Sequence, residues 1–155
     1  MNATAVEQKK FFTVAEANQR LPLVRAIVDD IVRLFVDVQE RQQRLQELKE
    51  RNPRRSQQPP SVYSEEIEHM EAALEADKER LRGFAGELAE LGVDLKDPTV
   101  GLVDFPTLVE GQEACLCWKL GEPDVGFWHD LNAGYRGRRP VADLMSCSRF
   151  EESKE

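Results

Sequence analysis

The sequence predicts an α+β protein in which a long antiparallel α-helical hairpin carries a small antiparallel β-meander. Apolar residues recur every three or four positions across two long segments, 27–48 and 67–91, which is the spacing of a helix seam. After Gly92 the period changes to two, which is typical of strands. We therefore expect a single domain of 155 residues, with the helical hairpin over 11–92 and the sheet with an Arg-rich loop over 93–140.

The first helix is expected to begin after Thr13. The Thr13 hydroxyl can cap the helix, and Glu16, three residues later, can reach back to the free amide of the cap. Pro22 has no amide hydrogen and crowds the preceding turn, so it should kink this helix or begin a second one. Its seam is Ile27, Ile31, Leu34, Val38, Arg41, Leu45 and Leu48.

The second helix follows a loop predicted at 52–61, where proline, serine and glutamine are concentrated. Each helix seam has one charged interruption, Arg41 in the first and Asp77 in the second. If these two face each other, every apolar seam position meets an apolar partner. We predict an ion pair between them that fixes the register, the alternative being that both extend independently into solvent. The second seam is Ile67, Met70, Leu74, Asp77, Leu81, Phe84, Leu88 and Leu91, and it ends at Gly92.

The length of the hairpin predicts self-association. Helices of this length span about 50 Å at 1.5 Å per residue, too far for the rest of the chain to cover. The outer apolar residues, such as Val24, Val28, Phe35 and Ala85, then need another surface. A homodimer that forms a four-helix bundle is the expected partner arrangement.

Glu66 and His69 have the Glu-x-x-His spacing of di-iron bundles. They flank the seam, however, and the first helix offers Lys49 and Asn52 opposite them in place of carboxylates. We interpret His69 as a surface histidine.

The sheet is expected to contain three or four strands. Short alternating runs occupy 93–96 and 102–105, the second closed by Pro106, and further strands are expected at 113–120 and 125–129. A turn centred on Pro123 and Asp124 would place Trp118 opposite His129 and Cys117 opposite Asp130. The face predicted to pack on the helices is then Leu116, Trp118, Leu120, Phe127 and His129, and the other face carries Cys115, Cys117 and Trp128.

Cys115, Cys117 and His129 have ligand atoms suited to zinc. The Cys-x-Cys spacing alone is a weak signal, and the predicted register directs His129 away from both thiols. A Cys-His nucleophilic pair fails on the same geometry, unless a one-residue bulge reverses the alternation. We favour core cysteines and a hydrogen-bonded core histidine, and expect no metal or cofactor, with zinc on these three residues as the alternative.

The loop 130–140 is the better functional candidate. Its arginines offer planar donors suited to carboxylate or phosphate, so it could cradle a small anionic ligand, with His129 as a general acid or base. The alternative is that the arginines hold the loop against carboxylates of the helices or of a neighbouring subunit. The candidate ligand-binding residues are Trp128, His129, Asp130, Tyr135, Arg136, Arg138 and Arg139.

Composition excludes several classes of function. The net charge of −8 argues against non-specific nucleic-acid binding, because a phosphate backbone requires a basic surface. No run of 18 apolar residues is present, so no membrane span is expected, and the first residues lack the apolar core of a signal peptide. Three cysteines, an odd number, fit a reducing compartment. We expect a cytoplasmic protein whose residues 146–155 form a disordered tail.

Three segments resemble an uncharacterised bacterial family, the domain of unknown function 2203. They are FTVAEANQRLP at 12–22, GVDLKDPTVGLVDFP at 92–106 and CWKLGEPDVGFWHDLNAGYRGRRP at 117–140. The resemblance covers most of the chain from Phe11 to Pro140 and implies no reaction, cofactor or catalytic residue. The expected function is a non-enzymatic, self-associating interaction or binding module. The alternatives are an anion-binding protein or enzyme that uses the loop from Trp128 to Arg139, and a metal-binding protein.

Overall fold

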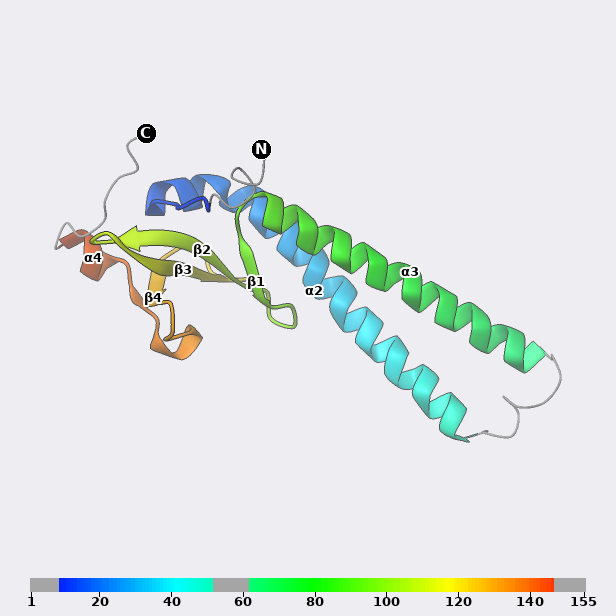
Figure 1. Cartoon of the computed structure of the whole chain (residues 1–155). Helices are drawn as coiled ribbons and strands as arrows, with labels where there is room; N and C mark the ends of the chain where they lie inside the picture. The colour runs from blue at the N-terminus through cyan, green and yellow to red at the C-terminus, as the bar shows by residue number, and fades with distance from the viewer. Residues whose placement is uncertain (1–8, 52–61, 147–155) are drawn as a thin grey trace.

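The computed structural model describes residues 9–51 and 62–146, and it confirms the α+β class. Two long antiparallel helices project from a five-stranded antiparallel sheet with strand order β1-β2-β3-β4-β5 (Figure 1). The predicted loop 52–61 and residues 147–155 of the predicted tail lie outside the described residues. The elements are α2 (Val14–Arg51), α3 (Val62–Glu90), β1 (Asp94–Asp97), β2 (Leu102–Val109), β3 (Gln112–Lys119), β4 (Phe127–Asp130), η2 (Tyr135–Gly137), β5 (Arg139–Pro140) and α4 (Ala142–Ser146).

Helix ends follow the predicted caps. The Thr13 amide donates to Glu16 Oε1 at 3.0 Å and the Glu16 amide donates to Thr13 Oγ1 at 3.1 Å, which is the predicted reciprocal capping arrangement. At the C-terminal end of α3, Gly92 has a positive φ of 87°. The Val93 amide donates to the Leu88 carbonyl and the Gly92 amide to the Ala89 carbonyl, so a Schellman motif ends α3.

Pro22 lies inside one continuous helix, so of the two predicted outcomes the structure has the kink and not a second helix. The axis of α2 changes direction (Figure 1). The first turns lie over the sheet, and the remainder pairs with α3. The side chain of Pro22 is exposed, which keeps its ring away from the packed face.

The two helices pair in the predicted register. Arg41 Nη2 donates to Asp77 Oδ2, which confirms the predicted ion pair. Arg80 Nη1 donates to the other carboxylate oxygen at 3.2 Å. Around this pair lies a small apolar cluster, which we call the distal cluster, consisting of Val38, Leu45, Ile67 and Leu74. Among the described residues, no helix is long and apolar enough to cross a membrane.

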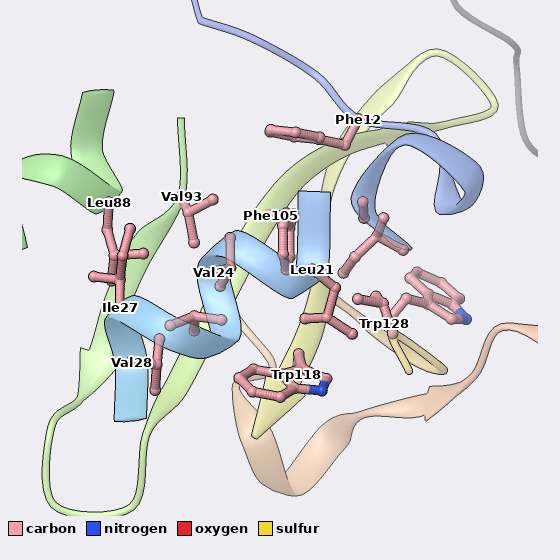
Figure 2. Close-up of a cluster of buried hydrophobic side chains, with 14 of the residues drawn as sticks. Phe12, Leu21, Val24, Ile27, Val28, Leu88, Val93, Phe105, Trp118 and Trp128 are labelled. Atoms are coloured by element: carbon pink, nitrogen blue, oxygen red, sulfur yellow. The ribbon is translucent and has the colours of Figure 1, made fainter. Parts of the chain in front are cut away.

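The main core lies between the first half of α2 and one face of the sheet. Val24 and Val28 are fully buried there, beside Phe105 and Trp118 (Figure 2). The expectation that these two valines need a partner molecule is therefore wrong, because the sheet of the same chain covers them. Further along the arm, Phe35 and Ala85 remain partly exposed.

Strand β2 continues through Pro106 to Val109, so the prediction that Pro106 closes the strand is wrong. β1 pairs with β2 only as far as Asp94 opposite Asp104, and beyond that point no described strand pairs with β2 on this side. A proline lacks the amide hydrogen for a ladder bond but is tolerated at an edge. Its carbonyl still accepts a hydrogen bond, from the Phe12 amide at 2.7 Å.

The predicted register of the last hairpin is also wrong. His129 pairs with Cys115 and Phe127 pairs with Cys117, which reverses the predicted alternation. The turn is longer than two residues because the loop is held by side chains. Glu122 accepts from the Lys119 amide at 3.0 Å, and Asn18 of α2 accepts from the Val125 amide at 2.7 Å.

The reversal changes the predicted faces of three neighbouring residues, Phe127, Trp128 and His129. Trp128, opposite Leu116, now faces the core, whereas His129 shares the opposite face with both thiols. This opposite face, directed away from α2, is called the outer face below.

Candidate functional site

The outer face of the sheet brings three polar side chains together in a buried position. Asp104 on β2 pairs with Cys117 on β3, and His129 on β4 lies one strand further. Their exposed fractions are 3%, 0% and 3%. One ligand atom from each, a carboxylate oxygen, the sulfur and a ring nitrogen, lies within 4.8 Å of the other two. We call these residues the Asp-Cys-His cluster.

Both nitrogens of the His129 ring have partners. Nδ1 lies 2.7 Å from the carbonyl oxygen of Asp130, and Nε2 lies 3.2 Å from each carboxylate oxygen of Asp104. A carbonyl oxygen only accepts, so Nδ1 carries the hydrogen. The ring is thereby fixed with Nε2 directed at Asp104.

The two thiols are poor nucleophiles at neutral pH. Burial raises the pKa of Cys117 to about 11, and burial raises that of Cys115 to about 11 as well. A catalytic cysteine requires a lowered pKa, so this arrangement does not favour nucleophilic catalysis. The prediction that His129 points away from the two thiols is wrong, because both thiols and His129 share the outer face.

A stacked layer of side chains lies beside Cys117 of the cluster. The guanidinium of Arg138 lies 3.9 Å from the ring centre of Phe127 and 4.3 Å from that of Tyr135. Arg138 also forms a bidentate ion pair with Glu122 and donates to Cys117 Sγ at 3.7 Å. Figure 1 shows the loop that contains η2, in orange, on the side of the sheet away from α2.

The other predicted anion-binding residues lie elsewhere. Trp128 faces the core, and the Arg139 guanidinium lies 4.7 Å from its ring centre and 3.3 Å from Asp130 Oδ2. Arg136 is exposed and forms no ion pair with any residue that the structure describes. The seven predicted residues therefore divide between the two faces of the sheet, and two of the three arginines already bind carboxylates.

Sequence reasoning missed Asp104 and Glu122. Asp104 is a charged residue in the otherwise apolar run Leu102–Phe105, and a charge in such a run is a signal for a buried polar role. Glu122 gave no comparable signal, since it lies beside Pro123 in a segment typical of an exposed turn. The carboxylates that bind Arg138 and Arg139 belong to Glu122, in the turn after β3, and to Asp130, at the end of β4. Neither residue lies on a helix.

A family model described as an uncharacterized conserved protein, DUF2203, matches residues 10–141. No curated protein and no solved structure matches the chain.

Proposed function

The chain belongs to the uncharacterised conserved protein family DUF2203, and from its geometry we propose that it is a non-enzymatic, self-associating module whose helical arm binds a second copy of the chain. The distal arm, defined as residues 33–51 of α2 with 62–82 of α3, is the part that projects beyond the sheet (Figure 1). The proposal rests on a groove along this arm.

The groove has a volume of about 850 Å³ and an apolar floor formed by Phe35, Val38 and Leu81. Val36 beside it on α2 is 40% exposed. Glutamine amides dominate the rest of the lining, and their steps of three and four residues repeat along one stripe of the helix. The polar lining residues are Gln39, Gln42, Gln43, Gln46, Glu47, Glu50 and Lys78.

A second copy is the partner that best fits this chemistry. A glutamine amide both donates and accepts, so the same residue can pair with its equivalent across a two-fold axis. Like charges at that position would repel, which matters in a chain of net charge −8. An antiparallel copy would also bring Lys78 of one chain towards Glu47 of the other.

The small core of the arm favours association with a second copy. The distal cluster contains four buried side chains, and the apolar residues packed against it are only partly buried. A pair of helices buries a single seam, whereas a four-helix bundle surrounds a central core. Removing the apolar floor of the groove from water would contribute about 25 cal/mol per Å² of apolar surface.

The test introduces charge into the groove without altering the core. Replacing Gln39 and Gln42 by glutamate places four extra carboxylates near the two-fold axis of the dimer. Both side chains are exposed, so the monomer should fold normally. Sedimentation equilibrium should show a dimer for the unchanged protein and at least a tenfold weaker association for the variant, about 1.4 kcal/mol.

Gln19 and Gln112 provide the matched control. Both are exposed and lie outside the groove, so their replacement by glutamate adds the same charge elsewhere. This control should associate as the unchanged protein does. A monomeric unchanged protein at millimolar concentration, or equal weakening in the two double variants, would contradict the proposal.

A further inference from the structure

The Asp-Cys-His cluster is a site that the proposed arm function leaves unexplained. Burying a carboxylate and an imidazole has a large desolvation cost unless each is fully paired. In this cluster the pairing is incomplete in a specific way. With the hydrogen on Nδ1, a neutral His129 directs the lone pair of Nε2 at the carboxylate of Asp104. Two acceptors that face each other need either a proton on Nε2 or a metal ion between them.

The distances between His129 and Asp104 leave room for a metal ion between the two groups. A charge-assisted hydrogen bond between an imidazolium and one carboxylate oxygen is typically about 2.7–2.9 Å long. Here Nε2 is 3.2 Å from both oxygens of Asp104, without preference for either. Two ligand atoms that each lie about 2.0 Å from a tetrahedral zinc are about 3.3 Å apart, which matches this separation.

We propose that Asp104, Cys117 and His129 bind a zinc ion. Imidazole nitrogen, thiolate sulfur and carboxylate oxygen are the three zinc ligand types of proteins, and the thiolate and imidazole disfavour calcium and magnesium. Three adjacent strands supply one ligand each, so the ion would link β2, β3 and β4, with His129 reaching diagonally from its position opposite Cys115.

The surroundings fit a bound metal. The Nδ1 hydrogen bond to the Asp130 carbonyl is the outer contact that commonly orients a metal-binding histidine. Arg138 donates to the Cys117 sulfur at 3.7 Å, which would stabilise a thiolate ligand. The layer of Arg138, Phe127 and Tyr135 lies beside Cys117. Three protein ligands would leave the fourth tetrahedral position to a water molecule.

Cobalt is the probe for the experiment, because thiolate-bound Co²⁺ has a charge-transfer absorption in the near ultraviolet. The full chain, purified without an affinity tag and carrying Cys147→Ser, is freed of metal with a chelator and titrated with Co²⁺. We expect one ion per chain, the charge-transfer band, and displacement of Co²⁺ by one equivalent of Zn²⁺. Absence of the band in this protein would overturn the proposal.

Two variants test the ligands. Asp104→Asn keeps the shape of the side chain, and its amide can donate to Nε2, so folding should be preserved, as circular dichroism would verify. Its zinc affinity, measured by competition with a chelating indicator, should fall at least about tenfold. Cys117→Ser should lose the cobalt band. Equal zinc affinity in Asp104→Asn and the parent would show that Asp104 is not a ligand and would overturn the proposed site.

Cys115→Ser is the matched control. Cys115 lies on the same face and opposite His129, but it is outside the cluster. This variant should retain the cobalt band and the zinc affinity of the parent. A loss as large as that of Cys117→Ser would overturn the assignment of these three ligands.

Discussion

At the scale of single residues, two ion pairs connect segments that are distant in the sequence. Arg138 binds Glu122 beneath the loop, and Arg41 binds Asp77 between the helices. The second pair lies in the middle of an apolar seam, where a lone polar contact can define one register against its neighbours. The contribution of the Arg41–Asp77 pair to the free energy of unfolding should depend on pH.

Asp77 should make the stability of the arm depend on pH below the neutral range. Hydrogen bonds from Arg41, and then from Arg80, lower the pKa of Asp77 in the folded protein. The unfolded chain therefore binds the proton more readily, and this stabilisation is present above the unfolded pKa of about 3.9 and lost as the pH falls through the lower folded value. Urea unfolding of the unchanged protein and of Asp77→Asn across this range should show a difference in unfolding free energy that shrinks with acidification. Parallel curves would show that Asp77 has no such role.

At the scale of elements, the junction between sheet and helix depends on close backbone approach. Gly101, in the turn between β1 and β2, is buried with a φ of 75°. Its amide donates to the Asp97 carbonyl, and its own carbonyl accepts from Leu120. A Cβ atom there would lie 2.8 Å from both Leu120 Cβ and Val28 Cγ1. The turn thus needs glycine for its conformation and for space.

Gly101→Ala should lower the free energy of unfolding by about 2–4 kcal/mol, from backbone strain and overpacking together. Gly86→Ala is the contrasting change, because Gly86 is exposed within α3 and a Cβ there meets no atom within 4 Å. It should raise the free energy of unfolding by up to about 1 kcal/mol through helix propensity. Chemical denaturation measures both, and a tolerated Gly101→Ala would contradict the account of this turn.

At the scale of the whole molecule, the two halves of the arm have different support. The first half of α2 packs on the sheet in the main core, whereas the distal arm has only its partner helix and the distal cluster. Local opening should therefore require less free energy in the distal arm. The division follows from the bend of α2, which leaves one part over the sheet and the other projecting beyond it (Figure 1).

Hydrogen exchange should reveal this division. At low protein concentration, amides of α2 from 17 to 31 should exchange much more slowly than those from 38 to 50. Raising the concentration should slow exchange in the distal arm selectively if a second copy binds there. Uniform protection along α2 at every concentration would contradict both the division and the proposed association.

The sequence alone determined those features that depend on local chemistry. The cap formed by Thr13 and Glu16, the end of α3 at Gly92 and the pairing of Arg41 with Asp77 were all predictable. Each of them depends on residues close in sequence or on a seam that repeats over many turns. Such patterns contain enough repeated information to define one arrangement.

Only the tertiary structure decided which residues share the candidate site. Alternation fixes which side chains lie together on a strand, but the relation between two strands depends on the loop that joins them. Here Glu122 and Asn18 hold the loop between β3 and β4 as a turn longer than two residues. Asn18 lies on α2, which is far from this loop in the sequence. Their contacts reverse the predicted faces of Trp128 and His129, and so bring His129 to Asp104 and Cys117. The physical reason is that a register is set by long-range contacts, which local periodicity does not contain.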